Sequence, residues 1–420
     1  MPERKTLTLH RRCAVFLGAA VSALGGLSAQ ADNAALQALF FDACANPSGA
    51  LAERCAETPG GLGDLSGDSE SSLNPSQTLG ATAATGSLVR ERAERARRRD
   101  GHPAGDGEDT AGAVLDLGPF SLLINGHGAR EDRDRTVDVD AERGYTLDVW
   151  GAELGLDYRF SPAVVAGAMV TWETSDLDFD RELPGVGFEP RGRAGSVTQD
   201  SLGIAGFASV AIGDRGYLDL SAGYVDSDYT LERRAVFQES QRLAPQTLVR
   251  TRGTPDGSET WAAIAAGYAA SRGGWSLAPH LGLTYSRARV DGYRERDLAG
   301  TGLAMDVGGQ TSRSLLGRLG VRVSRAVSRP GYVLLPQLNV EYLREFEADG
   351  PDTTVSYALD QGANTLTLRA DDRDRDYLHL GVGLTLLLPN GWMPFLEYRT
   401  TLGLEDVDRD RIALGLRVEL

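Results

Sequence analysis

Lysine, histidine and long apolar runs are nearly absent from this sequence of 420 residues. Lys5 is the only lysine among 43 basic residues, there are five histidines, and the formal net charge is −16. So acidic a chain lacks the basic surface that nucleic-acid binding requires, and this excludes nucleic acid as a partner. No run of about 18 apolar residues occurs beyond the N-terminal region, so helices that span a membrane are not expected.

The first 31 residues have the organisation of a secretory signal peptide. Basic residues at positions 4, 5, 11 and 12 precede the short apolar stretch 14–27, and Ala29-Gln30-Ala31 offers a cleavage site of small residues. We therefore predict export and cleavage after Ala31. Removing four basic residues and one acid lowers the net charge from −16 to −19 (−16 − 3).

Cysteine is scarce, with three residues in the whole chain. Cys13 leaves with the signal peptide, whereas Cys44 and Cys55 remain. An even number of cysteines in an oxidising compartment predicts a disulfide between them, which closes a loop around the turn sequence Asn46-Pro47-Ser48-Gly49. A metal site would need more ligands nearby than the sequence offers, so we expect none.

Residues 32–111 form a short N-terminal segment ahead of a different kind of sequence. The cysteine pair lies in a stretch, 32–62, that we expect to be partly helical. Residues 63–112 are rich in Gly, Ser, Asp, Thr and Arg, which is typical of a linker. Within this linker, residues 87–99 lack Gly and Pro and consist mostly of helix formers, so we predict a helix there.

From about Gly118 onward, apolar and polar residues alternate in segment after segment, which is the pattern of half-exposed strands. In residues 150–160, one face carries aromatic and aliphatic side chains, and the opposite face carries Gly, Glu153, Asp157 and Arg159. Residues 275–286, 378–386 and 412–420 alternate in the same way. The strands are expected to begin near residues 119, 145, 163, 197, 216, 259, 275, 313, 332, 377, 392 and 410.

Three features favour a membrane barrel over a soluble sandwich. Aromatic residues bound the apolar faces, as Trp275 and Tyr285 do, which is typical of the interfacial girdles of outer-membrane barrels. The other face is charged or glycine, as a wet lumen requires. Tight turns such as Pro389-Asn390-Gly391 alternate with long acidic connections near 129–144, 176–197, 229–258, 287–309 and 346–376. We therefore predict an all-β fold, a twelve-stranded antiparallel transmembrane barrel in the outer membrane of a Gram-negative cell. Because the number of strands is even, the chain is expected to enter and leave the barrel on the periplasmic side.

One long connection contains two further candidate strands. Residues 353–359 and 364–370 have the composition of a hairpin standing above the membrane, although a disordered loop is the alternative interpretation.

Residues 112–420 resemble the β-domain of autotransporters, the type V secretion proteins. The resemblance is carried by the strand pattern, by Trp392-Met393-Pro394-Phe395-Leu396-Glu397-Tyr398 in the penultimate strand, and by the terminal sequence 413–420. It implies a monomeric barrel in outer-membrane lipid, inserted by the barrel-assembly machinery with periplasmic chaperones. In that family the C-terminal assembly signal usually ends in an aromatic residue. Here Gly415, Val418 and Leu420 keep the Gly-x-x-apolar-x-apolar spacing, so we expect assembly.

The resemblance also implies a helix in the pore just ahead of the barrel. The predicted helix 87–99 has a net charge of +4 and offers six arginines: Arg90, Arg92, Arg95, Arg97, Arg98 and Arg99. Inward acids that could pair with them are Glu153, Asp157, Glu341 and Glu397. The alternative interpretation is a solvated linker helix.

Catalytic and metal-binding patterns are weak in this sequence. The mature histidines are His102, His127, His280 and His379, and no Ser-His-Asp set has matching orientation on neighbouring strands. Runs such as 371–376 alternate Asp with Arg, which favours a solvated loop over a calcium site. We therefore expect no enzyme, no cofactor and no metal.

Two main functions follow. The first is an autotransporter-type barrel that anchors or translocates its N-terminal segment and displays large acidic external loops. The alternative is a porin-like channel for small solutes, with the N-terminal segment as a periplasmic plug. An outer-membrane hydrolase is a weaker third hypothesis. Residues 32–111 contain no β-helix repeats, so we expect no large secreted effector.

Overall fold

The computed structural model describes residues 36, 38–57, 112–117, 120–133, 144–180, 195–237, 247–347, 352–369, 374–388, 392–404 and 410–418. Residues 38–43 are helical, and a second helix, α2 (Gly49–Glu57), follows after a turn. Nearly everything else is antiparallel β-structure, which confirms the predicted fold class. Among these described residues no helix is long and apolar enough to cross a membrane.

Twelve strands of nine or more residues make up most of the described chain, and each begins at or within three residues of a start expected from the sequence. They are β2 (Phe120–Arg133), β3 (Tyr145–Ser161), β4 (Val164–Phe179), β5 (Gly195–Ile212), β6 (Gly216–Phe237), β8 (Asp256–Tyr268), β10 (Trp275–Val290), β14 (Gln310–Arg325), β16 (Tyr332–Glu345), β19 (Asp376–Leu387), β20 (Trp392–Leu402) and β21 (Asp410–Val418).

Shorter strands extend this framework. They are β1 (Gly112–Leu117), β7 (Thr247–Gly253), β9 (Ala270–Arg272), β11 (Tyr293–Arg294), β12 (Arg296–Asp297), β13 (Met305–Val307), β15 (Val327–Arg329), β17 (Asp352–Tyr357) and β18 (Leu366–Arg369). Four of them, β11, β13, β17 and β18, pair into a small separate sheet. The β17–β18 pairing forms the hairpin that was one of the two interpretations of this connection.

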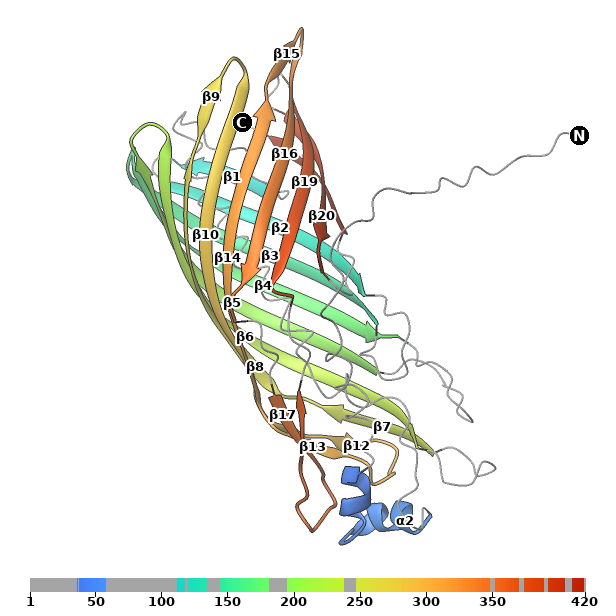
Figure 1. Ribbon diagram of the computed structural model, residues 1–420. Helices are drawn as coiled ribbons and strands as arrows, with labels where there is room; N and C mark the ends of the chain where they lie inside the picture. Colours follow the sequence, from blue (N-terminus) through green and yellow to red (C-terminus); the bar gives the residue numbers. More distant parts are fainter. Residues whose placement is uncertain are drawn as a thin grey trace, which may run out of the picture.

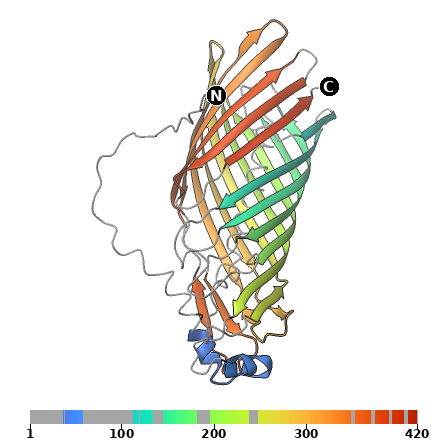
Figure 2. The same cartoon turned by 90° about the vertical axis from the view of Figure 1, so that its right-hand side faces the viewer.

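The long strands pair antiparallel with their neighbours in chain order, from β2 with β3 through to β20 with β21. The sheet curves round so that β21 comes back against β1 and β2 (Figures 1 and 2). One end carries the tight turns, including those next to β9 and β15, and we call it the tight-turn end. The other carries β7, β12, β13, β17 and α2, and we call it the long-connection end (Figure 1).

The two faces of the sheet are inverted relative to a soluble protein. On β3, Glu153 and Asp157 are buried at 4% and 5% exposure, whereas Trp150 and Leu154 on the other face are 64% and 52% exposed. The same exposed apolar face continues around the sheet, with members such as Ile204, Leu281 and Leu319. Apolar side chains outside and carboxylates inside are stable only if lipid covers the outer face.

The strands run well past this apolar band and into the predicted long connections, which corrects the predicted bounds of those connections, such as 229–258. On β6, Tyr224 ends the exposed apolar face, but pairing continues to Phe237. Beyond Tyr224 the pattern reverses, with Asp226 and Asp228 exposed and Tyr229 and Leu231 buried. The predicted strand ends where the apolar outer face ends. The strand itself continues beyond the membrane, where its outer face is polar and its inner face is apolar, as in a soluble protein.

That core lies between the ends of β3 to β10, at the long-connection end. It contains Tyr145, Leu147, Val149, Leu177, Phe179, Val197, Tyr229, Leu231, Ala288 and Val290. Tyr293 packs against this cluster and also against a second one at the tip of the molecule. Burial raises the pKa of both Tyr229 and Tyr293, so these phenols stay protonated.

Candidate functional site

The N-terminal cap, residues 38–57 together with Leu36, lies at the tip of the long-connection end (Figures 1 and 2). Its side chains Leu36, Leu39, Phe40, Ala43 and Leu51 are buried in the second cluster. The barrel contributes side chains from β7, the 303–307 segment and the β17–β18 hairpin: Val249, Leu303, Met305, Val307, Val355, Tyr357 and Leu368. The rings of Phe40 and Tyr357 meet edge to face, with centroids 5.8 Å apart. Cap and connections therefore share one core.

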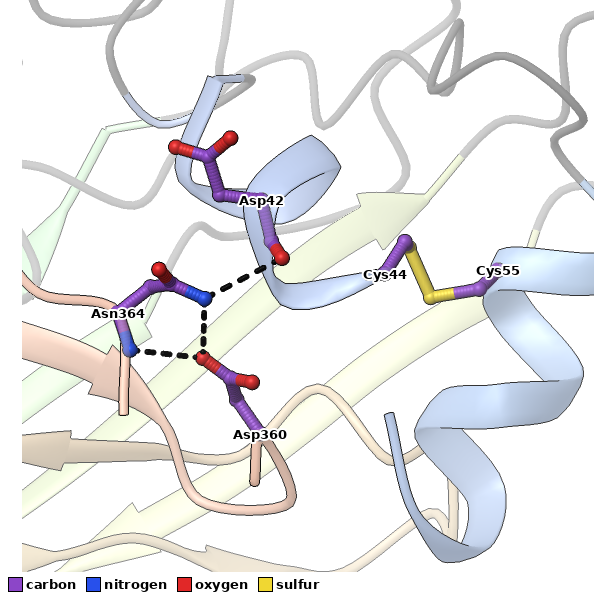
Figure 3. Close-up of a disulfide and its surroundings, with 5 residues drawn as sticks. All are labelled: Asp42, Cys44, Cys55, Asp360 and Asn364. Atoms are coloured by element: carbon purple, nitrogen blue, oxygen red, sulfur yellow. Dashed lines mark hydrogen bonds between the residues drawn. A yellow bond between two sulfur atoms is a disulfide. The ribbon is translucent and has the colours of Figure 1, made fainter. Parts of the chain in front are cut away.

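Backbone contacts fix the cap on the hairpin as well. Pro47 forms a β-bridge with Asp360, the Ser48 N–H donates to the Leu359 carbonyl at 3.0 Å, and the Gln361 N–H donates to the Asn46 carbonyl at 3.0 Å. The Asn364 amide donates to the Asp42 carbonyl at 3.2 Å (Figure 3). These hydrogen bonds satisfy backbone groups of both the cap and the hairpin, and they therefore fix the position of the cap on the hairpin.

The predicted disulfide is confirmed. Cys44 and Cys55 are bonded, with Cα atoms 5.4 Å apart. The bond joins the end of the helix 38–43 to α2 (Figure 3). The cap is too small to have a core of its own. By closing a short loop, the disulfide lowers the conformational entropy of the cap when it is not docked.

Beneath the cap, a buried ion pair holds the 287–309 connection to the ends of β6 and β7. The Arg233 guanidinium donates to both oxygens of Glu295, at 2.8 and 2.5 Å, and both side chains are 3% exposed. Thr251 Oγ1 and the Met305 N–H also donate to Glu295, and Arg233 donates to the Leu303 carbonyl. With both charges buried and multiply bonded, this network makes a rigid platform for the cap.

The inner wall between the two ends is polar. Three of the four acids expected to face inward, Glu153, Asp157 and Glu341, are buried there, together with Glu173, Asp219 and Glu259. Glu341 accepts a hydrogen bond from His280 Nε2 at 2.7 Å, and its other oxygen lies 3.8 Å from His379 Nδ1. Gly320 allows this approach, because a Cβ there would lie 2.5 Å from His280 Nε2. His280 is thus hydrogen-bonded to a wall carboxylate, and His379 lies close to the same group.

Several predicted site residues fall outside what the structure describes. The six arginines between Arg90 and Arg99, the side chain of Glu397, and Leu420 are among these, so their pairing in the pore stays a prediction. Gly415 and Val418 lie on β21, paired with Phe395 and Trp392 of β20. Among the described residues, no group of three or more His, Cys, Asp or Glu side chains is placed to hold a metal ion.

The sequence contained a signal for the cap that our prediction did not use. Leu36, Leu39, Phe40 and Ala43 follow the i, i+3, i+4, i+7 spacing of an amphipathic helix, which indicates a partner surface. The Arg233–Glu295 pair had no such signal, because its two residues lie far apart in a chain that is rich in Arg and acids.

Comparison with known proteins gives the family. The model of the family described as autotransporter beta-domain matches residues 124–399, well over half of the chain. The chain belongs to this family. It is therefore an outer-membrane autotransporter barrel, as the sequence resemblance implied.

A solved autotransporter structure has a similar fold. The translocator domain of NalP from Neisseria meningitidis is 16% identical, with a TM-score of 0.51, and the match covers 81% of this chain and 98% of that one. The transport unit of AIDA-I from Escherichia coli is 11% identical with a TM-score of 0.46, and the match covers 73% of this chain and 93% of that one.

A curated protein of Pseudomonas putida, described as an uncharacterized protein in the trpE-trpG intergenic region, is 35% identical over 162 residues. The match covers 37% of this autotransporter chain and 24% of that protein, so the chain spans about a quarter of the relative's length.

Proposed function

We propose that this autotransporter barrel delivers its own N-terminal segment to the cell surface and retains it there as a folded cap on the outer mouth. In this proposal the sheet closes as a monomeric twelve-stranded barrel, inserted by the assembly machinery with periplasmic chaperones, with the tight turns in the periplasm and the long connections outside. The signal peptide is removed near Ala31.

The observation that carries the proposal is the position of the cap. The last described strand, β21, ends beside the start of β20 at the tight-turn end, whereas the cap docks at the opposite end of the sheet. Short periplasmic turns and long external connections are the rule for outer-membrane barrels. A segment that enters from the periplasm and docks on the long connections has crossed the membrane. A periplasmic plug would instead lie at the tight turns.

Protease treatment of intact cells tests which side the cap occupies. We expect a cleavage site for a specific protease, inserted within residues 63–80, to be cut by enzyme added outside. The same site inserted at the tight turn Asp214-Arg215 serves as the control, because it faces the periplasm and is cut only after permeabilisation. Protection of the 63–80 site in intact cells would contradict the proposal and favour the channel with a periplasmic plug. A plugged channel also predicts that deletion of residues 32–111 increases the conductance of the protein in planar bilayers.

Retention of the cap depends on a close contact at Gly302. A Cβ at this residue would lie 2.3 Å from the backbone nitrogen of Leu51 in α2, and its φ is +81°. We expect Gly302→Val to release the cap into the medium once the linker has been cut, while the barrel still folds. Gly300→Val is the matched control, because Gly300 also has a positive φ, +68°, but faces open space. Equal release by both variants would show strain in the loop, not docking, to be the cause.

A further inference from the structure

The two halves of the N-terminal cap are held on the long connections to different extents. The first half, which contains the helix 38–43, buries four apolar side chains in the shared core: Leu36, Leu39, Phe40 and Ala43. The ring of Phe40 also meets that of Tyr357. After the helix, the Ser48 N–H donates to the β17–β18 hairpin and the Asn46 carbonyl accepts a hydrogen bond from it. This half therefore has enough contacts of its own to stay docked.

The second half, α2, is held more weakly. Leu51 is the one buried side chain among its nine residues. The first turn of α2 lies against Gly302, and Arg54 donates to Thr247 Oγ1 at 3.0 Å. Ordering the backbone of nine residues costs more free energy than the burial of one leucine returns. A helix of this length is also unstable by itself in water. Docking of α2 therefore needs a further contribution.

The disulfide supplies that contribution, because it ties the weakly held half of the cap to the firmly held one. Cys44 directly follows the helix 38–43 and precedes the anchored residues 46–48, whereas Cys55 lies near the C-terminal end of α2 (Figure 3). While the bond is intact, the two helices move as one body. Both cysteines are only partly buried against the shared core, and access is one of the conditions for thiol–disulfide exchange.

We propose that the Cys44–Cys55 bond is a redox switch that controls the docking of α2. A dithiol opens the bond by exchange: the two cysteines take up two electrons and two protons, and the dithiol becomes a disulfide. Then α2 leaves Gly302 while the helix 38–43 stays docked, so the cap presents a different surface. The proposal rests on Proposed function for the position of the cap outside the cell, where external thiols reach it.

Hydrogen exchange of the purified full-length protein in detergent, followed by mass spectrometry, tests the switch. We expect dithiothreitol to speed exchange of the α2 amides by roughly 100-fold, the effect of opening a loop of about this length. Exchange in the helix 38–43 should change little. Alkylation of the two thiols verifies that reduction is complete. Cys44→Ser/Cys55→Ser is the matched control: it should exchange as the reduced protein does, and dithiothreitol should not alter it.

Two outcomes of this measurement would overturn the proposal. Unchanged exchange in α2 after complete reduction would show that the contacts of Leu51 and Arg54 hold this helix without the bond. Equal acceleration in α2 and in the helix 38–43 would show that the bond supports the cap as a whole and that α2 does not open separately.

Gly302→Val gives a second readout. While the bond is intact, the displaced α2 pulls the helix 38–43 with it, so both helices should exchange rapidly. After reduction the helix 38–43 should regain its protection, because it is no longer tied to α2. Gly300→Val should behave as the unaltered protein in both states, since a Cβ there meets open space. Absence of this recovery would contradict the proposal. Because exchange is measured on purified protein, its outcome is independent of the cell-surface protease result.

Discussion

Leu281→Arg is expected to destabilise the inserted barrel, with a loss of about 2–4 kcal/mol in the free energy of unfolding from lipid vesicles. Leu281 lies midway between Trp275 and Tyr285 on the outer face of β10, and its side chain is 58% exposed. In a soluble protein, a charge at so exposed a site would be tolerated. Here the site faces the centre of the bilayer, so the guanidinium would have to leave water.

The measurement is refolding into vesicles, followed by urea titration. Thr230→Arg is the matched control, because Thr230 also faces outward, but on β6 beyond Tyr224, between Asp228 and Glu232. It should refold as the unaltered protein does. If Leu281→Arg were as stable as Thr230→Arg, the exposed apolar band would not be in lipid.

Glu295→Ala is expected to loosen the platform beneath the cap, at a cost of about 3–5 kcal/mol to the local structure of the long connections. Removing the carboxylate leaves the Arg233 guanidinium buried without its main partner, and it also deprives Thr251 and the Met305 N–H of their acceptor. Arg233 and Thr251 lie at the ends of β6 and β7 beyond the apolar band, so the strands within the membrane should stay intact. Hydrogen exchange of residues 287–309 and of the cap measures the effect.

Two comparisons separate the buried charge from general disturbance of the connection. Arg294→Met removes an exposed arginine that pairs with Asp306 in the same connection, and it should leave exchange unchanged. Arg233→Met/Glu295→Leu removes both buried charges together, and it should recover most of the protection lost in Glu295→Ala. Loss of protection in Arg294→Met equal to that in Glu295→Ala would contradict this role of the buried pair.

The membrane-facing part of the fold could be predicted almost strand by strand. Along β10, Trp275, Leu277 and Leu281 alternate with Ser276, His280 and Gly282, and this alternation fixes both the strand and its two faces. The tight turns could be located for the same reason, since Gly and Pro mark them locally. The disulfide followed from a cysteine count. The signals for strands and turns lie within a few neighbouring residues.

The long-connection end could not be predicted in the same way. On β6, the strand continues past Tyr224 while its buried face changes from polar to apolar, so a rule based on one period and one apolar face ends too early. The cap contacts residues about 200 to 320 positions away in the sequence, such as Asp42 with Asn364 and Arg54 with Thr247. Loop closure over such distances leaves no local pattern.

The sequence by itself determined the barrel class, the outward apolar band and the Cys44–Cys55 pair, because alternation, turn residues and cysteine number act over short distances. Only the tertiary structure decided where the N-terminal segment lies and which acid meets Arg233. Those features depend on register between strands that are distant in the chain. Register is fixed by pairing around the whole sheet, which no single segment encodes.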